Sequence, residues 1–219
     1  MTVSHRGTRK GFTTMIAVID YDAGNIRSVE HALAALGIPA VVTADADVIR
    51  KADRVILPGV GAFGDAMQKL NALGLTSVIR EVVAAGKPFL GICLGMQLMF
   101  DESEEAPGVP GLGLLPGRIV RIPEGGGRKI PHIGWNDLTF PKKSRLFDGL
   151  SDGSYVYFVH SYYLEAADFG CVAATTEYGV TIHAAVEQGT LCGCQFHPEK
   201  SGDVGMTILR NFADNPCNS

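Results

Sequence analysis

The sequence lacks the features that mark several specialised classes of protein. Its 219 residues include no run of about 18 or more apolar residues, so no membrane span is predicted. Basic residues do not outnumber acidic ones, and the formal net charge of −4 argues against a nucleic-acid-binding surface. The five cysteines are an odd number without the spacing of a disulfide framework. We therefore expect a reduced, cytoplasmic protein that binds neither membrane nor nucleic acid.

The first 14 residues contain few side chains that could pack into a core. They carry His5, Arg6, Arg9 and Lys10, and they lack the apolar stretch of a secretory signal. We predict that residues 1–14 form a disordered extension. The whole chain is 46% hydrophobic and 19% charged, which is typical of a globular protein. Since we find no internal repeat and no long linker, residues 15–214 are predicted to form one domain.

Strand-like and helix-like segments alternate in the first half of the chain. Short apolar runs predict buried strands at residues 15–20, 40–43, 54–57 and 89–92. Helical spacing of apolar residues predicts helices at 25–36, 66–73 and 78–85, with Asn25 able to cap the first. This alternation predicts an α/β fold in which a doubly wound, mostly parallel sheet of the flavodoxin-like type has helices on both faces.

The second half has a different pattern. An acidic loop rich in glycine and proline, which we expect to be solvated, spans residues 101–117. Strand-like runs follow at 118–122, 135–140, 155–159, 172–176, 181–186 and 190–195, and tight turns separate several of them. A closing helix is predicted at 203–212. These short strands favour an antiparallel extension of the parallel core.

The most informative motif is Gly91-Ile-Cys-Leu-Gly95. Cys93 lies between the strand ending at residue 92 and a helix predicted for 94–100. The flanking glycines remove the Cβ atoms that would crowd a sharp strand-to-helix turn. The pattern is that of a nucleophile elbow with sulfur in place of the serine oxygen, and a helix N-terminus favours the thiolate. The alternative is a buried core cysteine beside tightly packed glycines.

A cysteine nucleophile needs a base, and the base needs an orienting group. His197 and Glu199 follow an apolar strand and are two residues apart, so an extended backbone would point both in the same direction. Alone, His-Pro-Glu is also compatible with a surface turn. Together with the elbow it predicts a triad in which Glu199 orients His197 and His197 takes a proton from Cys93.

Such chemistry also requires an oxyanion hole. One candidate donor is the backbone amide of Leu94, directly after the cysteine. The others are the backbone amides of Gly59, Val60 and Gly61, which follow the strand at 54–57. The carboxyl ends of parallel strands share one edge of the sheet, so this loop and the elbow are expected to face each other.

These motifs resemble those of a known family. Gly91-Ile-Cys-Leu-Gly-Met-Gln97 with His197-Pro-Glu199 resembles the class I (triad) glutamine amidotransferases. Within that class, the chain is similar to the glutaminase subunits of imidazole glycerol phosphate synthases from Met15 to about Phe212. The segments that carry this similarity are 20–29, 58–63, 131–136 and 160–163.

The resemblance implies a specific reaction. Cys93 would attack the side-chain amide of L-glutamine, and a thioester would form as ammonia leaves; water would then release glutamate. Gln97 and the backbone of Ser161 and Tyr162 would hold the α-amino and α-carboxylate groups. Ammonia would pass to a separate cyclase subunit, a (β/α)8 barrel, in histidine biosynthesis. No metal and no organic cofactor is implied.

Two alternative functions remain at this point. The chain could supply ammonia to a different synthase, or it could be a catalytically silent regulatory protein on the same scaffold.

The sequence allows more than one interpretation of Trp135 and of the pair Cys192 and Cys194. The single tryptophan, Trp135, is expected in the core or as a hairpin anchor from composition, and toward the partner from the resemblance. Cys192 and Cys194 are expected to be buried thiols, because two further zinc ligands at matching spacing are missing.

Overall fold

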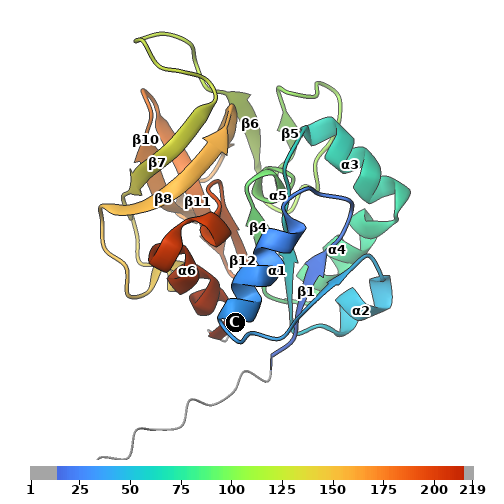
Figure 1. Ribbon diagram of the computed structural model, residues 1–219. Coiled ribbons are helices and arrows are strands. Elements are labelled where there is room, and N and C mark those ends of the chain that lie inside the picture. The colour runs from blue at the N-terminus through green and yellow to red at the C-terminus, as the bar shows by residue number, and fades with distance from the viewer. Residues whose placement is uncertain (1–13, 215–219) are drawn as a thin grey trace, which may run out of the picture.

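The computed structural model describes residues 14–214 (Figure 1). Apart from Thr14, the extension predicted for residues 1–14 lies outside the described residues, and the single-domain assignment stays a prediction. Five parallel strands form the centre of the sheet. In spatial order they are β2 (Ala40–Thr43), β1 (Ile16–Ile19), β3 (Arg54–Leu57), β4 (Phe89–Ile92) and β12 (Leu191–Cys194).

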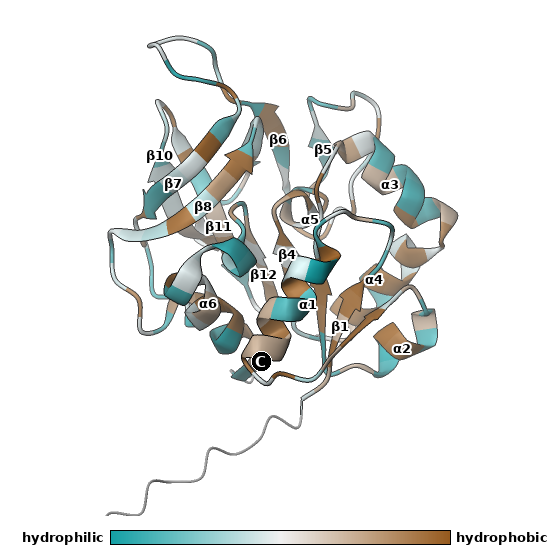
Figure 2. Ribbon diagram, in the orientation of Figure 1, coloured by the Kyte–Doolittle hydropathy of each residue, from teal (hydrophilic) through white to brown (hydrophobic). Residues whose placement is uncertain are grey.

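Helices cover both faces of this parallel core because its strands are apolar on both sides. Along β1, Ala17 and Ile19 pack into one core cluster, whereas Ile16 and Val18 pack into another. The first cluster includes residues of α2 (Ala46–Lys51), α3 (Phe63–Ala72) and α4 (Leu75–Ala84). The second includes residues of α1 (Ile26–Ala35) and α6 (Gly202–Asp214). Figure 2 shows β1 and β4 as hydrophobic strands between these layers.

Mostly antiparallel strands extend the sheet beyond β12. β11 (Thr181–Gln188) pairs with β12, and the order continues through β9 (Tyr162–Ala166), β6 (Gly117–Arg121) and β5 (Glu102–Ser103). Only the outermost pair, β6 and β5, is parallel. β10 (Val172–Glu177) pairs with the same β11. β7 (His132–Leu138) and β8 (Ser154–His160) form a separate two-stranded ribbon. Short 3₁₀ turns span Arg145–Phe147, Phe169–Cys171 and Pro198–Lys200. The predicted fold class is confirmed.

The structure differs from the sequence prediction in several elements. α2 was not predicted, although Asp45 caps it by accepting hydrogen bonds from the amides of Asp47 and Val48. β9 was also missed. The helix predicted for residues 94–100 is the single turn α5 (Leu94–Gln97). It ends early because loop amides bond to the carbonyl oxygens of the next residues, as when the Leu112 amide bonds to the Leu98 carbonyl. The N-terminus of α5 therefore offers Cys93 only a short helix dipole.

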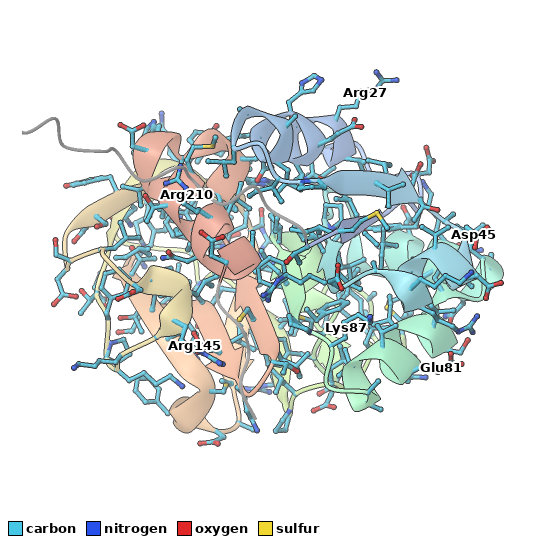
Figure 3. The ribbon with its side chains drawn as sticks, turned by 90° about the horizontal axis from the view of Figure 1, so that it is seen from below. Arg27, Asp45, Glu81, Lys87, Arg145 and Arg210 are labelled. Atoms are coloured by element: carbon cyan, nitrogen blue, oxygen red, sulfur yellow. The ribbon has the colours of Figure 1, made fainter. Side chains whose placement is uncertain are left out.

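The outer surface carries the charged side chains. Figure 3 shows Arg27 and Glu81 pointing away from the ribbon at the edge of the molecule. Within the described range 14–214, no helix is both long and apolar enough to cross a membrane.

Candidate active site

Cys93 occupies a strained turn at the carboxyl end of β4. Its φ of 54° and ψ of −112° are unusual for a residue with a side chain. A Cβ atom at Gly95 would lie 1.8 Å from the Leu57 carbonyl oxygen, and one at Gly91 would lie 2.7 Å from the Gly95 carbonyl oxygen. Both positions therefore need glycine. The sharp strand-to-helix turn expected from the motif is present, and Cys93 is 6% exposed with its sulfur at a pocket.

His197 is held close to that sulfur by its own backbone. Its amide donates to the Tyr157 carbonyl oxygen at 3.0 Å, and its carbonyl accepts from the Ser201 hydroxyl at 2.6 Å. His197 Nδ1 lies 2.8 Å from Glu199 Oε1, and both side chains are fully covered. The expected contact is present, but the extended backbone proposed for it is wrong. Pro198 starts a 3₁₀ turn instead, which brings Glu199 back under the ring.

The contact with Glu199 sets the direction of the histidine ring. A carboxylate only accepts hydrogen bonds, so Nδ1 carries the hydrogen and Nε2 is the atom left for chemistry. Nε2 is buried, and no hydrogen bond of ordinary geometry reaches it from the described residues. Burial alone would lower the pKa of His197, but the Cys93 thiol and the Glu199 carboxylate outweigh it and raise the pKa from 6.5 to about 9. The site therefore favours a protonated ring beside the sulfur.

Two amide side chains complete these contacts. Asn25 precedes α1 as expected, but its side chain does not cap the helix. Asn25 Nδ2 instead donates to Glu199 Oε1 at 3.3 Å. Gln195 Nε2 lies 3.7 Å from Cys93 Sγ as a donor to the sulfur. Sequence reasoning did not find either role, because both contacts join residues more than a hundred positions apart.

The loop at Gly59–Gly61 faces the elbow, as its place at a strand end predicted. The Leu94 amide donates to the Gly59 carbonyl oxygen at 3.3 Å. A Cβ atom at Gly59 would lie 2.5 Å from the Tyr21 hydroxyl, so close packing requires glycine there. Gly61 has φ +100°, which favours glycine for a different reason. In this conformation a carbonyl, rather than an amide, is directed at the Leu94 donor.

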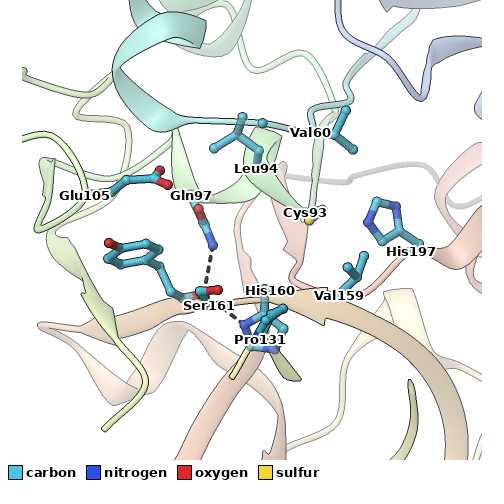
Figure 4. Close-up of a pocket in the computed structure, with 12 residues that line it drawn as sticks. Val60, Cys93, Leu94, Gln97, Glu105, Pro131, Val159, His160, Ser161 and His197 are labelled. Atoms are coloured by element: carbon cyan, nitrogen blue, oxygen red, sulfur yellow. Dashed lines mark hydrogen bonds between the residues drawn. The ribbon is translucent and has the colours of Figure 1, made fainter. Parts of the chain in front are cut away.

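A cavity of about 330 Å³ opens beside the cysteine (Figure 4). Among the predicted residues, it is lined by Val60, Gly61, Cys93, Leu94, Gln97, Ser161, Tyr162 and His197. Residues not predicted to contribute are Glu105, Pro131, Val159 and His160. Of the expected site residues, Gly59 and Glu199 lie behind this lining rather than in it. The volume suits a small polar ligand.

Gln97 is oriented by its own hydrogen bonds. Its Nε2 donates to the Tyr162 carbonyl oxygen at 2.9 Å and to Gln195 Oε1 at 2.9 Å. Both amide hydrogens are thus used, and the amide oxygen of Gln97 is left as an acceptor for the pocket. Figure 4 shows the bond from Gln97 to Tyr162 at the cavity wall.

Glu105 gives the pocket a negative charge. It belongs to the acidic loop that we expected to be solvated, and for this residue that prediction is wrong. Glu105 Oε2 accepts a hydrogen bond of 2.8 Å from the Phe63 amide at the start of α3, and the side chain reaches the cavity. It is the only carboxylate among the lining residues. Its position depends on how the loop folds over α3, and no local sequence pattern shows this.

The structure also shows where Cys192, Cys194 and Trp135 lie. Cys192 and Cys194 are buried, as expected. Among residues 14–214, no three His, Cys, Asp or Glu side chains gather in a way that could hold a metal ion. Trp135 is 55% exposed, so its expected place in the core is wrong. It lies on β7 with its ring against Tyr157, facing outward.

Comparison with known proteins decides the family. The family model described as "Glutamine amidotransferase class-I" matches residues 17–215. The chain belongs to the class I glutamine amidotransferase family. This family assignment agrees with the resemblance carried by the cysteine and histidine motifs.

The family's HisH members are close relatives of the chain. "Imidazole glycerol phosphate synthase subunit HisH" of Methanothermobacter thermautotrophicus is 50% identical over 200 residues, covering 91% of this chain and 98% of the relative. The HisH subunit of Bacillus cereus strain G9842 is 52% identical over 198 residues, covering 90% and 93%. A solved structure of a glutamine amidotransferase, 23% identical, has a TM-score of 0.70 and covers 90% of this chain and 98% of that one, which shows the same fold. Within the amidotransferase family, the chain groups with the HisH glutaminase subunits.

Proposed function

We propose that this chain hydrolyses L-glutamine at Cys93 and delivers the ammonia to a cyclase subunit of imidazole glycerol phosphate synthase. The observation that carries the proposal is the fixed direction of His197. Glu199 holds Nδ1, and the buried Nε2 is left without another partner beside the cavity that also holds the cysteine. The identity of about 50% to HisH subunits supports the choice of acceptor.

The reaction follows from these positions. Cys93 Sγ attacks the side-chain carbonyl carbon of glutamine, and the carbonyl oxygen becomes an oxyanion. Protonated His197 Nε2 gives its proton to the departing nitrogen, which leaves as ammonia, and a thioester remains. His197 then takes a proton from water as the water attacks the thioester, and glutamate leaves while the thiol is restored. Glu199 stabilises the imidazolium throughout.

The oxyanion needs two donors, and only one peptide must turn to supply them. In the structure, the Leu94 amide already donates its hydrogen bond to the Gly59 carbonyl oxygen. The Gly59 carbonyl and the Val60 amide belong to the same rigid peptide unit and point in opposite directions. Turning that unit would remove the carbonyl from Leu94 and put the Val60 amide in its place. The free chain is therefore expected to have low activity until its partner and the partner's ligand favour the turned state.

Glutamine recognition is assigned to both ends of the amino acid. Glu105 and the amide oxygen of Gln97 offer two acceptors for the α-ammonium group. Ser161 and Tyr162 also line the cavity, and we assign their backbone amides to the α-carboxylate. The charge of Glu105 makes it the stronger of the two ammonium contacts.

The partner surface is assigned to the outer face of the β7–β8 ribbon. Ile133, Trp135 and Tyr155 are 59%, 55% and 56% exposed, and they alternate with buried or half-buried residues along the two strands. Val159, opposite Ile133 in the ribbon, also lines the cavity. A partner covering this face would close the pocket mouth and limit loss of ammonia to water. From the resemblance that partner is a (β/α)8 barrel, and a free thiol at Cys93 fits the reducing cytoplasm.

A coupled assay tests the proposal. The chain is purified together with the cyclase, and glutamate release and ring formation are measured with glutamine or with ammonium salts. Cys93→Ala should abolish glutamine-dependent synthesis while ammonium-dependent synthesis continues. Survival of the glutamine-dependent rate in that variant would show another nucleophile. If the wild-type complex releases no glutamate, the chain is a silent scaffold, and if it releases glutamate but forms no ring, the acceptor is wrong.

A further inference from the structure

Two buried histidines outside the triad connect the β7–β8 ribbon to the cavity. His132 begins β7 and His160 ends β8, and they are cross-strand partners. His132 Nδ1 lies 3.0 Å from His160 Nε2, and His160 Nδ1 lies 2.9 Å from the Tyr162 carbonyl oxygen. The side chains are only 3% and 7% exposed. The proton transfers described above use neither ring, so the pair needs a separate explanation.

The hydrogen bonds between these groups can run in only one direction. A carbonyl oxygen cannot donate, so His160 Nδ1 carries the hydrogen, and Nε2 of the neutral ring accepts. His132 must then donate through Nδ1, which leaves its Nε2 as an acceptor 3.5 Å from Asn136 Nδ2. Burial lowers the pKa of His132 to about 4 and that of His160 to about 3, so both rings are neutral at pH 7. Each ring is therefore held as the Nδ1–H tautomer.

Stacking fixes the orientation of the first ring. His132 lies between Phe158, with ring centroids 4.7 Å apart, and Tyr178, with centroids 3.9 Å apart, and both pairs are nearly parallel. The Tyr178 hydroxyl is itself held by the Lys129 carbonyl at 2.7 Å. The His132 ring therefore has little rotational freedom. Its Nδ1–H keeps the His160 ring in one orientation through the hydrogen bond to His160 Nε2.

The last acceptor in this series is the carbonyl oxygen of Tyr162, a residue that lines the glutamine cavity. The Tyr162 carbonyl accepts from both His160 and Gln97, which uses its two lone pairs (Figure 4). The preceding carbonyl, that of Ser161, accepts from the Ile122 amide at 2.9 Å. Because each peptide unit is planar, the bond to the Ser161 carbonyl fixes the Tyr162 amide, and the bonds to the Tyr162 carbonyl fix the Tyr163 amide. The orientation of the Tyr162–Tyr163 peptide and of the Gln97 side chain therefore depends on His160.

We propose that His160, supported by His132, is a positioning residue for glutamine: it holds the Tyr162 carbonyl, and through it the Gln97 side chain, so that the Gln97 amide oxygen faces the α-ammonium group. The inference rests on the proposed glutaminase function. It assigns to the pair a role in substrate affinity rather than in bond breaking. Its signature is a raised KM with a smaller change in kcat.

A set of variants tests this role in the complex with the cyclase. His160→Phe keeps the ring shape but removes the donor to Tyr162, whereas His160→Asn keeps a donor at nearly the same place. We expect His160→Phe to raise the KM for glutamine about tenfold, the loss of about one hydrogen bond, with His160→Asn nearer to wild type. His183→Phe is the control, since His183 is a half-buried sheet histidine that lies outside the cavity lining and whose Nδ1 accepts a hydrogen bond from the Ala166 amide. An unchanged KM in a folded His160→Phe variant would overturn the proposal.

Two measurements remain decisive if that variant fails to fold or if turnover is absent. Nitrogen-15 spectra of the histidine-labelled full chain should show His132 and His160 as Nδ1–H tautomers, and an Nε2–H tautomer at His160 would refute the positioning role. Calorimetric glutamine binding can be compared in Cys93→Ala with and without His160→Leu, a smaller side chain that also lacks the donor, which tests affinity without turnover. Weaker glutamine binding by the double variant, in a complex where wild type releases no glutamate, would support the positioning role while the proposed function fails, and equal binding would overturn the positioning role. No binding to Cys93→Ala at millimolar glutamine would count against both.

Discussion

The Leu94 amide donates a hydrogen bond to the Gly59 carbonyl oxygen across 3.3 Å, directly beside the nucleophile. A donor that should stabilise an oxyanion is thus already occupied. The free energy needed to break this bond and turn the Gly59–Val60 peptide is a barrier that partner binding can offset. This one contact explains how an otherwise assembled site could remain nearly inactive in the free chain.

Val60→Pro tests whether the Val60 amide is needed. Proline has no amide hydrogen, so the turned peptide could offer the oxyanion only the Leu94 donor. We expect kcat for glutamine hydrolysis by the complex to fall about a hundredfold to a thousandfold, as for loss of one oxyanion donor. Val60→Ala keeps the amide and should lose far less. Equal rates for the two variants would show that the second donor lies elsewhere.

Glu199→Gln tests the orienting carboxylate. A neutral amide can still reach His197 Nδ1, but it removes the charge that stabilises the imidazolium, so the pKa of His197 should fall and kcat should drop about ten-thousandfold. The domain should stay folded. Because the pKa of His197 is raised to about 9, its stabilising effect is present below pH 6.5 and is lost as pH rises through 9. Histidine NMR titration and unfolding between pH 6 and 10 measure both effects, and an unshifted pKa would exclude the role of Glu199.

Glu105→Gln tests recognition of the α-ammonium group. Removing the single lining carboxylate should raise the KM for glutamine about tenfold to a hundredfold, because a hydrogen bond between two charged groups is lost. The side-chain amide introduced at position 105 keeps an oxygen that can accept from the Phe63 amide, so the loop should stay in place. Glu104→Gln, on the adjacent residue that bonds the Arg121 amide instead, is a suitable control. Steady-state glutamate release gives the KM, and similar values for both variants would remove the assignment.

Acid should destabilise the chain through its buried neutral histidines. The pKa of His160 is lowered to about 3, so the unfolded chain takes up a proton near pH 6.5 that the folded chain refuses. The stability that depends on this neutral ring is present above pH 6.5 and is lost as pH falls toward 3, at about 1.4 kcal/mol per pH unit. Urea unfolding at several pH values measures the slope. His160→Phe should make it shallower by about that amount, and an identical slope would contradict the assignment.

The parts of the site that follow local patterns could be predicted from the sequence. Cys93 lies between two glycines, and the need for Gly91 is local, since a Cβ there would collide with the backbone of Gly95 and Met96 in the next turn. His197 and Glu199 are two residues apart, so a single tight turn after His197 is enough to bring the carboxylate within hydrogen-bond distance of the ring. The parallel strands also placed the Gly59 loop opposite the elbow. These inferences needed only spacing and the rule that strand ends share an edge.

The parts that depend on distant contacts could not be predicted. Asn25 looked like a helix cap, and only the fold shows that its amide bonds to Glu199 instead. Glu105 looked like one of several solvated acids until the loop placed it over the Phe63 amide. His132 and His160 form a cross-strand pair at the ends of β7 and β8, and both residues lie outside the strands predicted for 135–140 and 155–159. Each of these contacts spans 28 or more positions of the chain.

The β7–β8 ribbon separates two sets of side chains by residue parity, and the partner proposed above would meet only one of them. Ile133, Trp135 and Tyr155 face outward, while His132, Phe158 and His160 face inward. Residues that meet a partner can change with that partner without touching the inward set. Transplanting only the outward positions between orthologues should therefore transfer partner preference while leaving amino-acid selectivity as it was.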